Sequence, residues 1–357
     1  MSEGAKIAVT GVGGGVGQSI IRALRRSNAG YRILGLDMNP LSAGLYQCDR
    51  AKPVPPCDHA DYVPRLAEIL IEEKVAVLIP GSDPELSVLA EAKSALEETG
   101  AHVFVGGAEA VAICRDKLAC ARFFRQHGLP FVRTVPVQEA MDLAEEVGFP
   151  LIVKPLGGSA SRGTELVFDA KGLERHLGRE GYIAQEFAMP AVWKDDFARR
   201  GAASVFPRGA LRQEEEVSIQ VLLDHEANRL GTFCSVNRLQ SGVPIHVDPR
   251  RIPEAEAIVG RMADELIGVG LTGPTNYQCR LTDEGPKVFE INPRFTGITA
   301  VRAAMGFNEV DAILGRILRG LSVEDARGAL VQPSDVVSCR YVDEIVVPRD
   351  RLCGIEE

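Results

Sequence analysis

The chain has 357 residues, which is enough for two or three compact units with sizeable cores. Its net charge of −9 and pI near 5.4 argue against nucleic acid or an anionic membrane as the main partner. The sequence has no run of about 18 apolar residues and no apolar signal-peptide segment, so we expect a cytoplasmic protein without membrane contact. Its eight cysteines form no CxxC pair, and this usage is typical of structural thiols in a reducing compartment.

The first element is an apolar strand over residues 6–10, followed by the glycine run GVGGGVG, which opens a helix. A second strand over residues 32–36 ends at Asp37, 20 residues after Gly17. Taken alone, this is the dinucleotide-binding fingerprint, in which a pyrophosphate approaches the helix N-terminus and the acid binds a ribose. The alternative is that the glycines only form a tight turn or line a substrate site.

Further strands over residues 75–80 and 103–105 flank a helix expected over residues 84–98. This alternation, which continues to about residue 112, predicts a parallel sheet. The segment GSDPE follows the strand at its carboxyl end, where ligands of open α/β sheets bind. Ser82, Asp83 and Glu85 therefore either cap the helix or contact a substrate amine.

A helix is expected from residues 115–117 to Gly128, and another over residues 138–147. The segment FPLIVKPLGGSASRGTELV then predicts a strand that ends in Lys154, followed by a glycine-rich loop. Lys154 supplies a compact positive charge, and glycines let backbone N–H groups curl over a phosphate. The pattern GxxxxGK[ST] is absent, and a loop without a ligand is the alternative.

The strand YIAQEF, residues 182–187, precedes a stretch of about 25 residues that holds the only Trp and has no clear periodicity. We expect a long loop there, with a lid over a substrate as one interpretation. The next strand begins in EEEVSIQVL and contains both Glu215 and Glu216. A strand over residues 229–235 and the segment NRLQSGVPIH, which contains Arg238, follow.

The most informative segment is GPTNYQCRLTDEGPKVFEINPRFTG, residues 273–297. It predicts two strands joined by a polar turn at residues 282–286. If the turn is centred on Glu284, Gln278 lies opposite Glu290 and Asn276 lies opposite Asn292. Alternation then places four residues on the opposite face, toward a core: Tyr277, Cys279, Phe289 and Ile291.

The polar face of this hairpin would present several oxygen atoms beside Arg294. Such a cluster suits Mg²⁺, which prefers oxygen ligands and takes one or two carboxylates together with substrate phosphates. An adjacent Arg can hold a phosphate oxygen in a two-pronged contact. An ordinary exposed hairpin face is the alternative.

The sequence Glu-Ile-Asn-Pro-Arg at the end of this hairpin resembles the ATP-grasp superfamily, whose metal site is written E-x-N-x-R. The likeness covers about residues 1–325 and is strongest to carbamoyl-phosphate synthetase half-modules and to stand-alone pyrrolysine-pathway ligases. It implies an α/β fold with a Rossmann-like pre-ATP-grasp domain and a two-subdomain ATP-grasp unit. The implied boundaries are 1–113, 114–183, 184–325 and a tail over 326–357.

The resemblance also assigns roles to individual residues. It implies catalytic roles for Arg294, Arg238 and Lys154, and Mg²⁺ ligation by Gln278, Glu290 and Asn292. It implies that ATP contacts Lys117, Lys154, Gly157, Gly158, Ser159, Gly163, Glu186, Phe187 and Glu216. The chain departs from the family where Glu216, the best match to the ribose-binding Glu, stands 30 residues after Glu186. It also lacks the His of the His-Thr-Gly pattern of carbamoyl-phosphate synthetase modules.

The resemblance implies an ATP- and Mg²⁺-dependent ligase that activates a small carboxylate as an acyl phosphate and joins it to an amine. Two Mg²⁺ ions are expected, with Mn²⁺ as a substitute, and a homodimer is left open. One alternative is a carbamoyl-phosphate-synthetase-like enzyme acting on bicarbonate or carbamate. A second is an NAD(P)-dependent oxidoreductase built on GVGGGVG, and a third is a non-catalytic nucleotide sensor.

Overall fold

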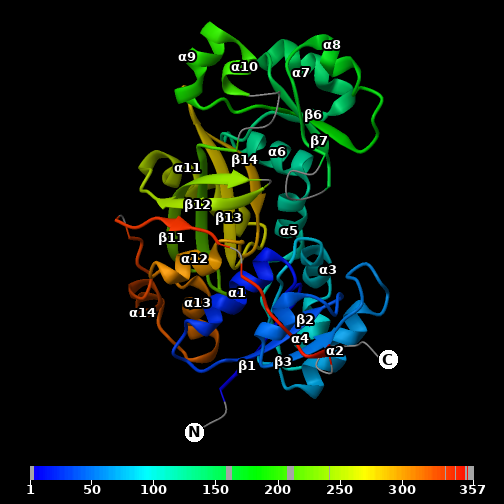
Figure 1. Ribbon diagram of the computed structural model, residues 1–357, viewed down its shortest axis with the longest axis vertical. Helices are drawn as coiled ribbons and strands as arrows, with labels where there is room; N and C mark the ends of the chain where they lie inside the picture. The colour runs from blue at the N-terminus through cyan, green and yellow to red at the C-terminus, as the bar shows by residue number, and fades with distance from the viewer. Residues whose placement is uncertain are drawn as a thin grey trace.

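The computed structural model describes residues 4–157, 163–206, 213–240, 242–333, 335–341, 343–349 and 352. Within them the chain forms three sheets that follow one another along the long axis of the molecule (Figure 1). The sheet of the N-terminal unit is parallel, and the other two are antiparallel. Among the described helices, none is both long and apolar enough to cross a membrane.

The N-terminal sheet has the strand order β3-β2-β1-β4-β5. Its strands are β1 (Lys6–Val9), β2 (Arg32–Asp37), β3 (Arg50–Pro53), β4 (Val77–Ile79) and β5 (His102–Val103). The strand order reverses between β1 and β4, and loops at such a point form the ligand crevice of α/β sheets. The glycine run follows β1 and the GSDPE segment follows β4, so both lie at this crevice.

The helices of this unit are α1 (Gly15–Arg25), η1 (Ala43–Gln47), α2 (Tyr62–Glu72), α3 (Glu85–Glu91), α4 (Lys93–Glu97) and α5 (Ala108–Arg115). The single helix expected over residues 84–98 is therefore wrong in detail. It is divided at Ala92, whose ψ of 1° leaves the helical range.

The second sheet has the order β6-β9-β7-β8 and carries Lys154 near the end of β7. Its strands are β6 (Thr134–Pro136), β7 (Leu151–Pro155), β8 (Glu165–Val167) and β9 (Tyr182–Glu186). The associated helices are α6 (Lys117–Gln126), η2 (Val137–Glu139), α7 (Ala140–Val147) and α8 (Ala170–Glu174). The side chain of Asp116 caps α6 by accepting N–H groups of Leu118 and Ala119.

The stretch after β9, expected to be a long loop, instead forms α9 (Ala191–Arg200) and α10 (Ala202–Val205). Trp193 and Phe206 are buried there and share an apolar cluster with Ile152 of β7 and with Phe187, the residue after β9. The expectation of a loop was wrong because these widely spaced aromatic residues form a core with a distant strand. Residues 207–212 of the same stretch lie outside the described residues.

The third sheet has the order β14-β13-β10-β11-β12-β15. Its strands are β10 (Glu216–Leu223), β11 (Arg229–Gln240), β12 (Val243–Pro249), β13 (Pro274–Thr282), β14 (Gly285–Asn292) and β15 (Ser338–Cys339). Helix α11 (Pro253–Ile267) covers the apolar face, where Ile219, Tyr277 and Met262 belong to one core cluster. The opposite face is polar and takes part in the site described below.

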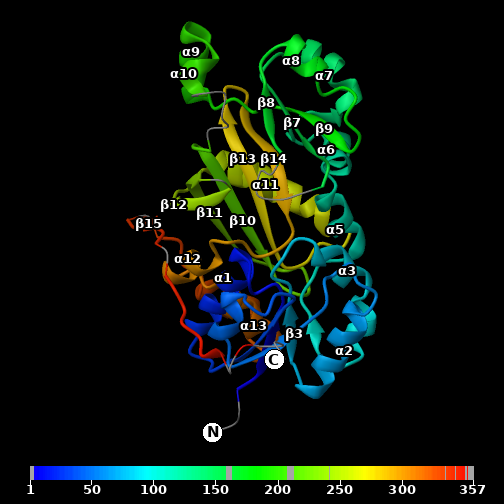
Figure 2. The ribbon, with the colours of Figure 1, turned by 45° about the vertical axis from the view of Figure 1, so that its right-hand side comes forward.

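Three C-terminal helices follow the hairpin: α12 (Thr299–Ala304), α13 (Glu309–Leu318) and α14 (Val323–Gly328). Of these, α12 and α13 lie beside α1 of the N-terminal unit (Figure 2). Ile313 and Leu314 of α13 share a core cluster with Ile20 and Ile21 of α1. The expected 184–325 unit therefore contains helices that also complete the core of the expected 1–113 unit, and these boundaries stay a prediction.

Candidate functional site

The hairpin β13–β14 has the register expected from its sequence. Gln278 pairs with Glu290 and Asn276 pairs with Asn292. The register shifts immediately afterwards, so Cys279 pairs with Val288 and leaves Phe289 as an extra residue on β14. The expected core position of Phe289 is therefore wrong: Val288 is fully buried instead, and Phe289 lines the cavity.

A cavity of about 460 Å³ lies over the polar face of this hairpin. Its walls come from the second and third sheets and from the segments that follow β1 and β4 of the N-terminal sheet. Among the residues singled out from the sequence, the cavity is lined by Lys117, Lys154, Gly157, Glu216, Gln278, Glu290, Asn292 and Arg294. Its size is in the range of small-molecule sites.

Lys154 enters the cavity from β7 and is almost completely buried. Its Nζ donates a hydrogen bond of 2.8 Å to Oε1 of Gln185. Burial lowers the pKa of the ammonium to about 8, against the opposing effect of the Glu290 carboxylate. Lys117 adds a second cation, and its Nζ donates to the Leu156 carbonyl at 3.2 Å. The two lysines give one side of the cavity an anion-binding character.

Glu290, Gln278 and Asn292 offer one carboxylate and two amide oxygens to the same cavity. Nδ2 of Asn292 donates to Oε1 of Glu290 at 3.3 Å, so the two side chains are in contact. Across the described residues there is no cluster of three or more His, Cys, Asp or Glu side chains that could hold a metal ion. The donor set fits Mg²⁺ only where phosphate oxygens complete the coordination, and it does not form a protein-only cage.

Arg294 forms a two-pronged ion pair with Asp83 of the N-terminal unit. Both side chains are only 12% exposed. Burial alone would raise the pKa of Asp83, but the Arg294 guanidinium and the nearby Arg115 outweigh burial and hold the pKa below its usual value. Arg294 is therefore oriented by a residue from another sheet.

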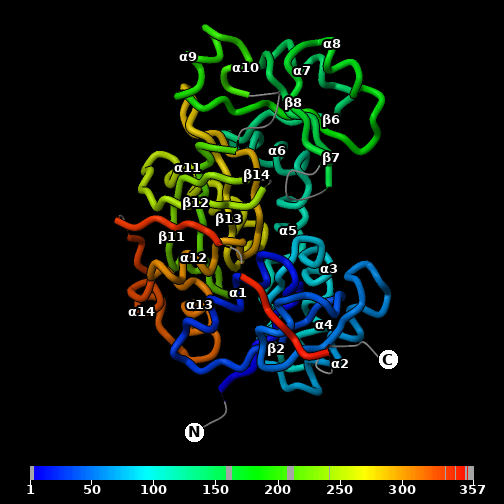
Figure 3. The backbone as a smooth tube through the Cα atoms, in the orientation of Figure 1, coloured from blue at the N-terminus to red at the C-terminus, as the bar shows by residue number. Residues whose placement is uncertain are grey.

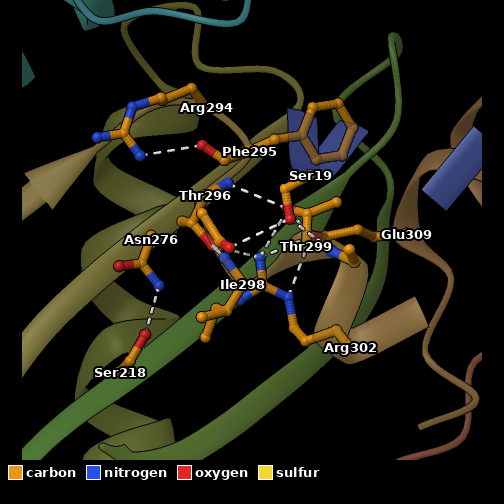
Figure 4. Close-up of polar contacts among 12 residues, drawn as sticks. Ser19, Ser218, Asn276, Arg294, Phe295, Thr296, Ile298, Thr299, Arg302 and Glu309 are labelled. Carbon is orange, nitrogen blue, oxygen red and sulfur yellow. Dashed lines mark hydrogen bonds and ion pairs between the residues drawn. The ribbon is translucent and has the colours of Figure 1, made fainter. Parts of the chain in front are cut away.

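The loop after the hairpin, residues 293–298, is held by buried polar contacts (Figure 4). Arg302 and Glu309 form a fully buried ion pair of 2.6 Å, and Nη2 of Arg302 also donates to Oγ1 of Thr296 at 2.9 Å. Ser19 of α1 donates to the Gly297 carbonyl and accepts from the Ala300 N–H. These contacts fix Thr296, Gly297 and Ile298, which line the cavity.

Sequence reasoning missed Arg280, which pairs with Glu216 at 2.8 Å in the cavity wall. Both side chains are buried, and the guanidinium lies 4.6 Å from the centre of the Phe187 ring. Strand alternation from Gln278 would have placed Arg280 on the polar face, so the signal was present. Glu215 is exposed, whereas the neighbouring Glu216 lines the cavity.

Several expected site residues lie elsewhere. Arg238 does not line the cavity as expected. Its side chain is 60% exposed, and its Nε lies 3.5 Å from Oε1 of Glu214. The neighbouring residues Asn237 and Leu239 line the cavity instead. This follows from strand alternation, which directs Arg238 to the other face. Glu186 binds Lys287 at 2.5 Å, Phe187 packs in the apolar cluster, and neither they nor Gly163 line the cavity. Gly158 and Ser159 lie outside the described residues.

The glycine run of the N-terminal unit is hydrogen-bonded to Asp37, the acidic residue at the end of β2. Asp37 accepts hydrogen bonds from the Gly13 N–H at 2.6 Å, the Ser42 hydroxyl at 2.8 Å and the Asn39 N–H at 2.9 Å. A Cβ at Gly13 would lie 2.3 Å from Oγ of Ser42, so the two segments are in close contact. The Asp37 carboxylate, which would bind the ribose of a dinucleotide, thus already accepts hydrogen bonds from neighbouring segments of the N-terminal unit.

Two family models match the chain. Residues 7–104 match the model described as PylC-like, N-terminal domain, and residues 211–344 match the model described as ATP-grasp in the biosynthetic pathway with Ter operon. The first match covers the parallel sheet, and the second covers β10 to β15. Together they confirm the expected resemblance.

The chain is also similar to curated proteins. It is 25% identical over 252 residues to a carbamoyl phosphate synthase large chain of Mycobacterium sp. (strain JLS), covering 67% of this chain and 21% of that one. This chain thus spans about a fifth of that relative. It is 26% identical over 319 residues to a formate-dependent phosphoribosylglycinamide formyltransferase of Synechococcus sp. (strain CC9311), covering 82% and 75% of the two chains.

Among solved structures, an N5-carboxyaminoimidazole synthetase from Staphylococcus aureus complexed with ADP is similar, with a TM-score of 0.65 and 17% identity. The similarity covers 95% of this chain and 81% of that chain. It confirms the expected fold, an ATP-grasp unit preceded by a Rossmann-like domain.

Proposed function

Since this chain combines a PylC-like N-terminal domain with an ATP-grasp domain, we propose that it is an ATP- and Mg²⁺-dependent ligase that joins a carboxylate to an amine. The observation that carries the proposal is that the paired Gln278 and Glu290 line the same cavity as the buried Lys154. Oxygen donors and buried cations are both needed where a triphosphate binds with its metal ion.

The proposed reaction has two stages. A carboxylate oxygen attacks the γ-phosphorus of ATP, which breaks the bond to the β-phosphate oxygen and yields an acyl phosphate and ADP. An amine then attacks the acyl carbon, phosphate leaves, and the amine loses a proton as the amide forms. Neither stage needs a nucleophile from the protein, so positioning and charge neutralisation supply the catalysis.

The residues of the cavity divide these tasks. Lys117 and Lys154 bind the phosphates of ATP, and Arg294 binds an oxygen of the transferred phosphoryl group. Glu290, Gln278 and Asn292 would hold Mg²⁺, which when bound neutralises phosphate charge. We propose two such ions, with Mn²⁺ as a substitute. Glu216, anchored by Arg280, faces the ribose.

The oxidoreductase alternative is disfavoured by Asp37, whose carboxylate is engaged by its own loop. The cavity is lined by Gly14 and Gly15 of the same loop, which supports a substrate-lining role for the glycines. We therefore expect ATP with Mg²⁺ to raise the melting temperature, because a ligand that binds the folded state stabilises it. NADH should leave the melting temperature unchanged.

The test of the proposal measures ATP-dependent phosphate release with a panel of small carboxylates, bicarbonate and amines. Glu290→Gln keeps the size of the side chain but removes its charge, so phosphate release should fall by about 100-fold or more. The matched control is Glu284→Gln in the turn of the same hairpin, where the side chain is 75% exposed. It should retain activity within about twofold, since exposed ion pairs contribute little.

Near-full activity of Glu290→Gln at ordinary Mg²⁺ would overturn the proposed metal site. Phosphate release with bicarbonate alone would favour the carbamoyl-phosphate-synthetase-like alternative. A melting-temperature rise with NADH and none with ATP would favour the oxidoreductase.

A further inference from the structure

Gln185 is a fully buried polar residue on the face of the second sheet that lines the cavity. Figure 3 shows β6 and β7 of this sheet at the end of the molecule opposite the N-terminal unit. Gln185 lies on β9, where it pairs with Ile152 of β7 and with Thr134 of β6. Paired residues of adjacent strands point to the same face, so Gln185 shares the face of Lys154, two residues after Ile152.

A chain of hydrogen bonds fixes both ends of the Gln185 amide. Nζ of Lys154 donates to Oε1 of Gln185 at 2.8 Å, and Nε2 of Gln185 donates to Oγ1 of Thr134 at 3.0 Å. The Thr134 hydroxyl in turn donates to the Val132 carbonyl at 3.1 Å. An ammonium group only donates hydrogen bonds, so the oxygen end of the amide must face Lys154. Gln185 therefore holds the ammonium through a neutral oxygen.

Two buried arginines of the same cavity are held differently. Arg280 is paired with the Glu216 carboxylate, and Arg294 is paired with the Asp83 carboxylate. Each of these guanidinium groups has its charge matched by the protein itself. The neutral contact of Lys154 is therefore not how this cavity holds all of its cations.

The second lysine of the cavity follows the pattern of Lys154. Nζ of Lys117 donates to the Leu156 carbonyl, which is also a neutral oxygen. Within the described ranges, no carboxylate lies within ion-pair distance of either lysine. Both ammonium groups thus keep an uncompensated charge for an anion in the cavity.

The charged groups around Lys154 are evenly divided. Two cations and two carboxylates of other elements act on its ammonium: Lys117, Arg280, Glu216 and Glu290. A carboxylate at position 185 would add a third negative charge in direct contact with the ammonium, in a buried environment where such a charge acts strongly. The neutrality of Gln185 therefore decides how much of the Lys154 charge is left for a ligand.

We propose that Gln185 is a positioning residue for the triphosphate, whose neutral amide holds the Lys154 ammonium at the cavity without neutralising it. It acts through Lys154 and not by contact with the reacting atoms. This inference rests on the proposed ligase function, which assigns the phosphates of ATP to Lys154. The affinity for ATP should accordingly depend on the charge of residue 185 and not only on its size.

The test measures two quantities on the full-length protein. Isothermal titration calorimetry gives the Kd for a non-hydrolysable ATP analogue with Mg²⁺, and thermal unfolding gives the melting temperature without ligand. Gln185→Glu keeps the size of the side chain and an acceptor oxygen but adds a charge. Its Kd should increase by about tenfold or more, because the new carboxylate pairs with Lys154 and repels phosphate. Its melting temperature should not fall, since the buried ammonium gains a charged partner.

Gln185→Met keeps the length of the side chain and removes both hydrogen bonds without adding a charge. Its melting temperature should fall, because Lys154 and Thr134 lose their partners, but its Kd should increase less than that of Gln185→Glu. The matched control is Gln138→Glu, the same substitution at an exposed position next to β6 that does not line the cavity. Its Kd should stay within about twofold of the wild type, since exposed charges contribute little.

The inference is overturned if Gln185→Glu binds the analogue like the wild type or is less stable than the wild type. It is also overturned if Gln185→Met weakens binding as much as Gln185→Glu does, because Gln185 would then have only a structural role. If the wild type itself does not bind the analogue, the ligase function fails together with this inference. Binding by the wild type that is unaffected by Gln185→Glu removes this inference alone, so the two failures are distinguishable.

Discussion

Asp83 and Arg294 join two sheets through a pair of parallel hydrogen bonds, 2.7 Å from Nε to Oδ1 and 2.9 Å from Nη2 to Oδ2. Asp83 follows β4 of the N-terminal unit, and Arg294 follows β14 of the hairpin. A two-pronged carboxylate contact fixes both the position and the plane of a guanidinium. The N-terminal unit therefore orients Arg294, which lines the end of the cavity where we propose that phosphate binds.

The first prediction concerns this pair. Asp83→Asn keeps one acceptor oxygen but removes the negative charge, so Arg294 loses its fixed orientation. We expect kcat for ATP-dependent phosphate release to fall by about tenfold or more, which corresponds to about 1.4 kcal/mol of transition-state stabilisation. KM for ATP should change by less than about threefold, because Lys117 and Lys154 are untouched.

The control is Asp61→Asn, which removes an exposed carboxylate from the same unit, where Asp61 is 77% exposed. Its kcat should equal that of the wild type. If Asp83→Asn also leaves kcat unchanged, Asp83 does not position Arg294 for the reaction.

The second prediction is a pH dependence of ATP binding. The pKa of Lys154 lies at about 8 because burial disfavours its charged form. The ammonium is protonated below this value and loses its charge as the pH rises through it, so the Kd for ATP should increase above pH 8. Lys154→Arg keeps its charge at all working pH values, because the guanidinium pKa is above about 12. Isothermal titration calorimetry at about six pH values, from about pH 6.5 to about pH 9.5, gives the Kd for ATP of the wild type and of Lys154→Arg. A wild-type Kd that stays constant over this range would contradict the assignment.

The third prediction concerns folding stability and Glu85. This residue is buried beneath the glycine run, accepts a hydrogen bond from the Thr10 hydroxyl, and burial raises its pKa to about 7. Between its unfolded pKa of about 4.3 and pH 7, the folded state binds more protons than the unfolded state. The free energy of unfolding should therefore fall as the pH rises through that window and become level above it, with a total change of about 4 kcal/mol.

Glu85→Gln stays neutral, so its unfolding free energy should lack this decrease. Glu91→Gln, at an exposed position of the same helix, should keep it. Urea unfolding at several pH values gives the comparison. A decrease that persists in Glu85→Gln would assign it to another group.

The local parts of the fold could be predicted from the sequence. Alternation and a polar turn gave the register of β13 and β14, and strand–helix alternation gave the parallel sheet. Alternation failed at Phe289, because a bulge shifts every side chain beyond it to the other face. The helices after β9 could not be predicted either, since their apolar side chains pack against Ile152, which lies on the distant strand β7.

Local motifs predicted individual residues of the candidate site, but they did not predict the contacts between residues of different motifs. Glu290, Asn292 and Gln278 belong to one hairpin, and the structure brings them to the cavity with Lys154. The contact of Asp83 with Arg294 spans 211 residues of sequence, and that of Lys287 with Glu186 spans 101. No periodicity encodes such pairs, because they depend on how separate sheets are placed relative to each other.

The last prediction concerns Arg302 and Glu309, which are both fully buried and hold the loop after the hairpin. Arg302→Met leaves the Glu309 carboxylate buried without its counter-ion, and removing one partner of such a pair costs about 3–5 kcal/mol of unfolding free energy. In the double variant Arg302→Met/Glu309→Gln the uncompensated charge is gone, so we expect about half of this loss to be recovered.

The same variants should also affect the cavity, because Thr296 loses its contact with Arg302. The cavity-lining residues 296–298 should loosen in both variants. KM for the amine substrate should therefore rise, while Kd for ATP should stay near that of the wild type. Urea unfolding together with steady-state kinetics separates the two effects. Equal stability of the single and double variants would mean that Glu309 is protonated or solvated once Arg302 is removed, and an unchanged KM would mean that the loop is held by its contacts with Ser19 alone.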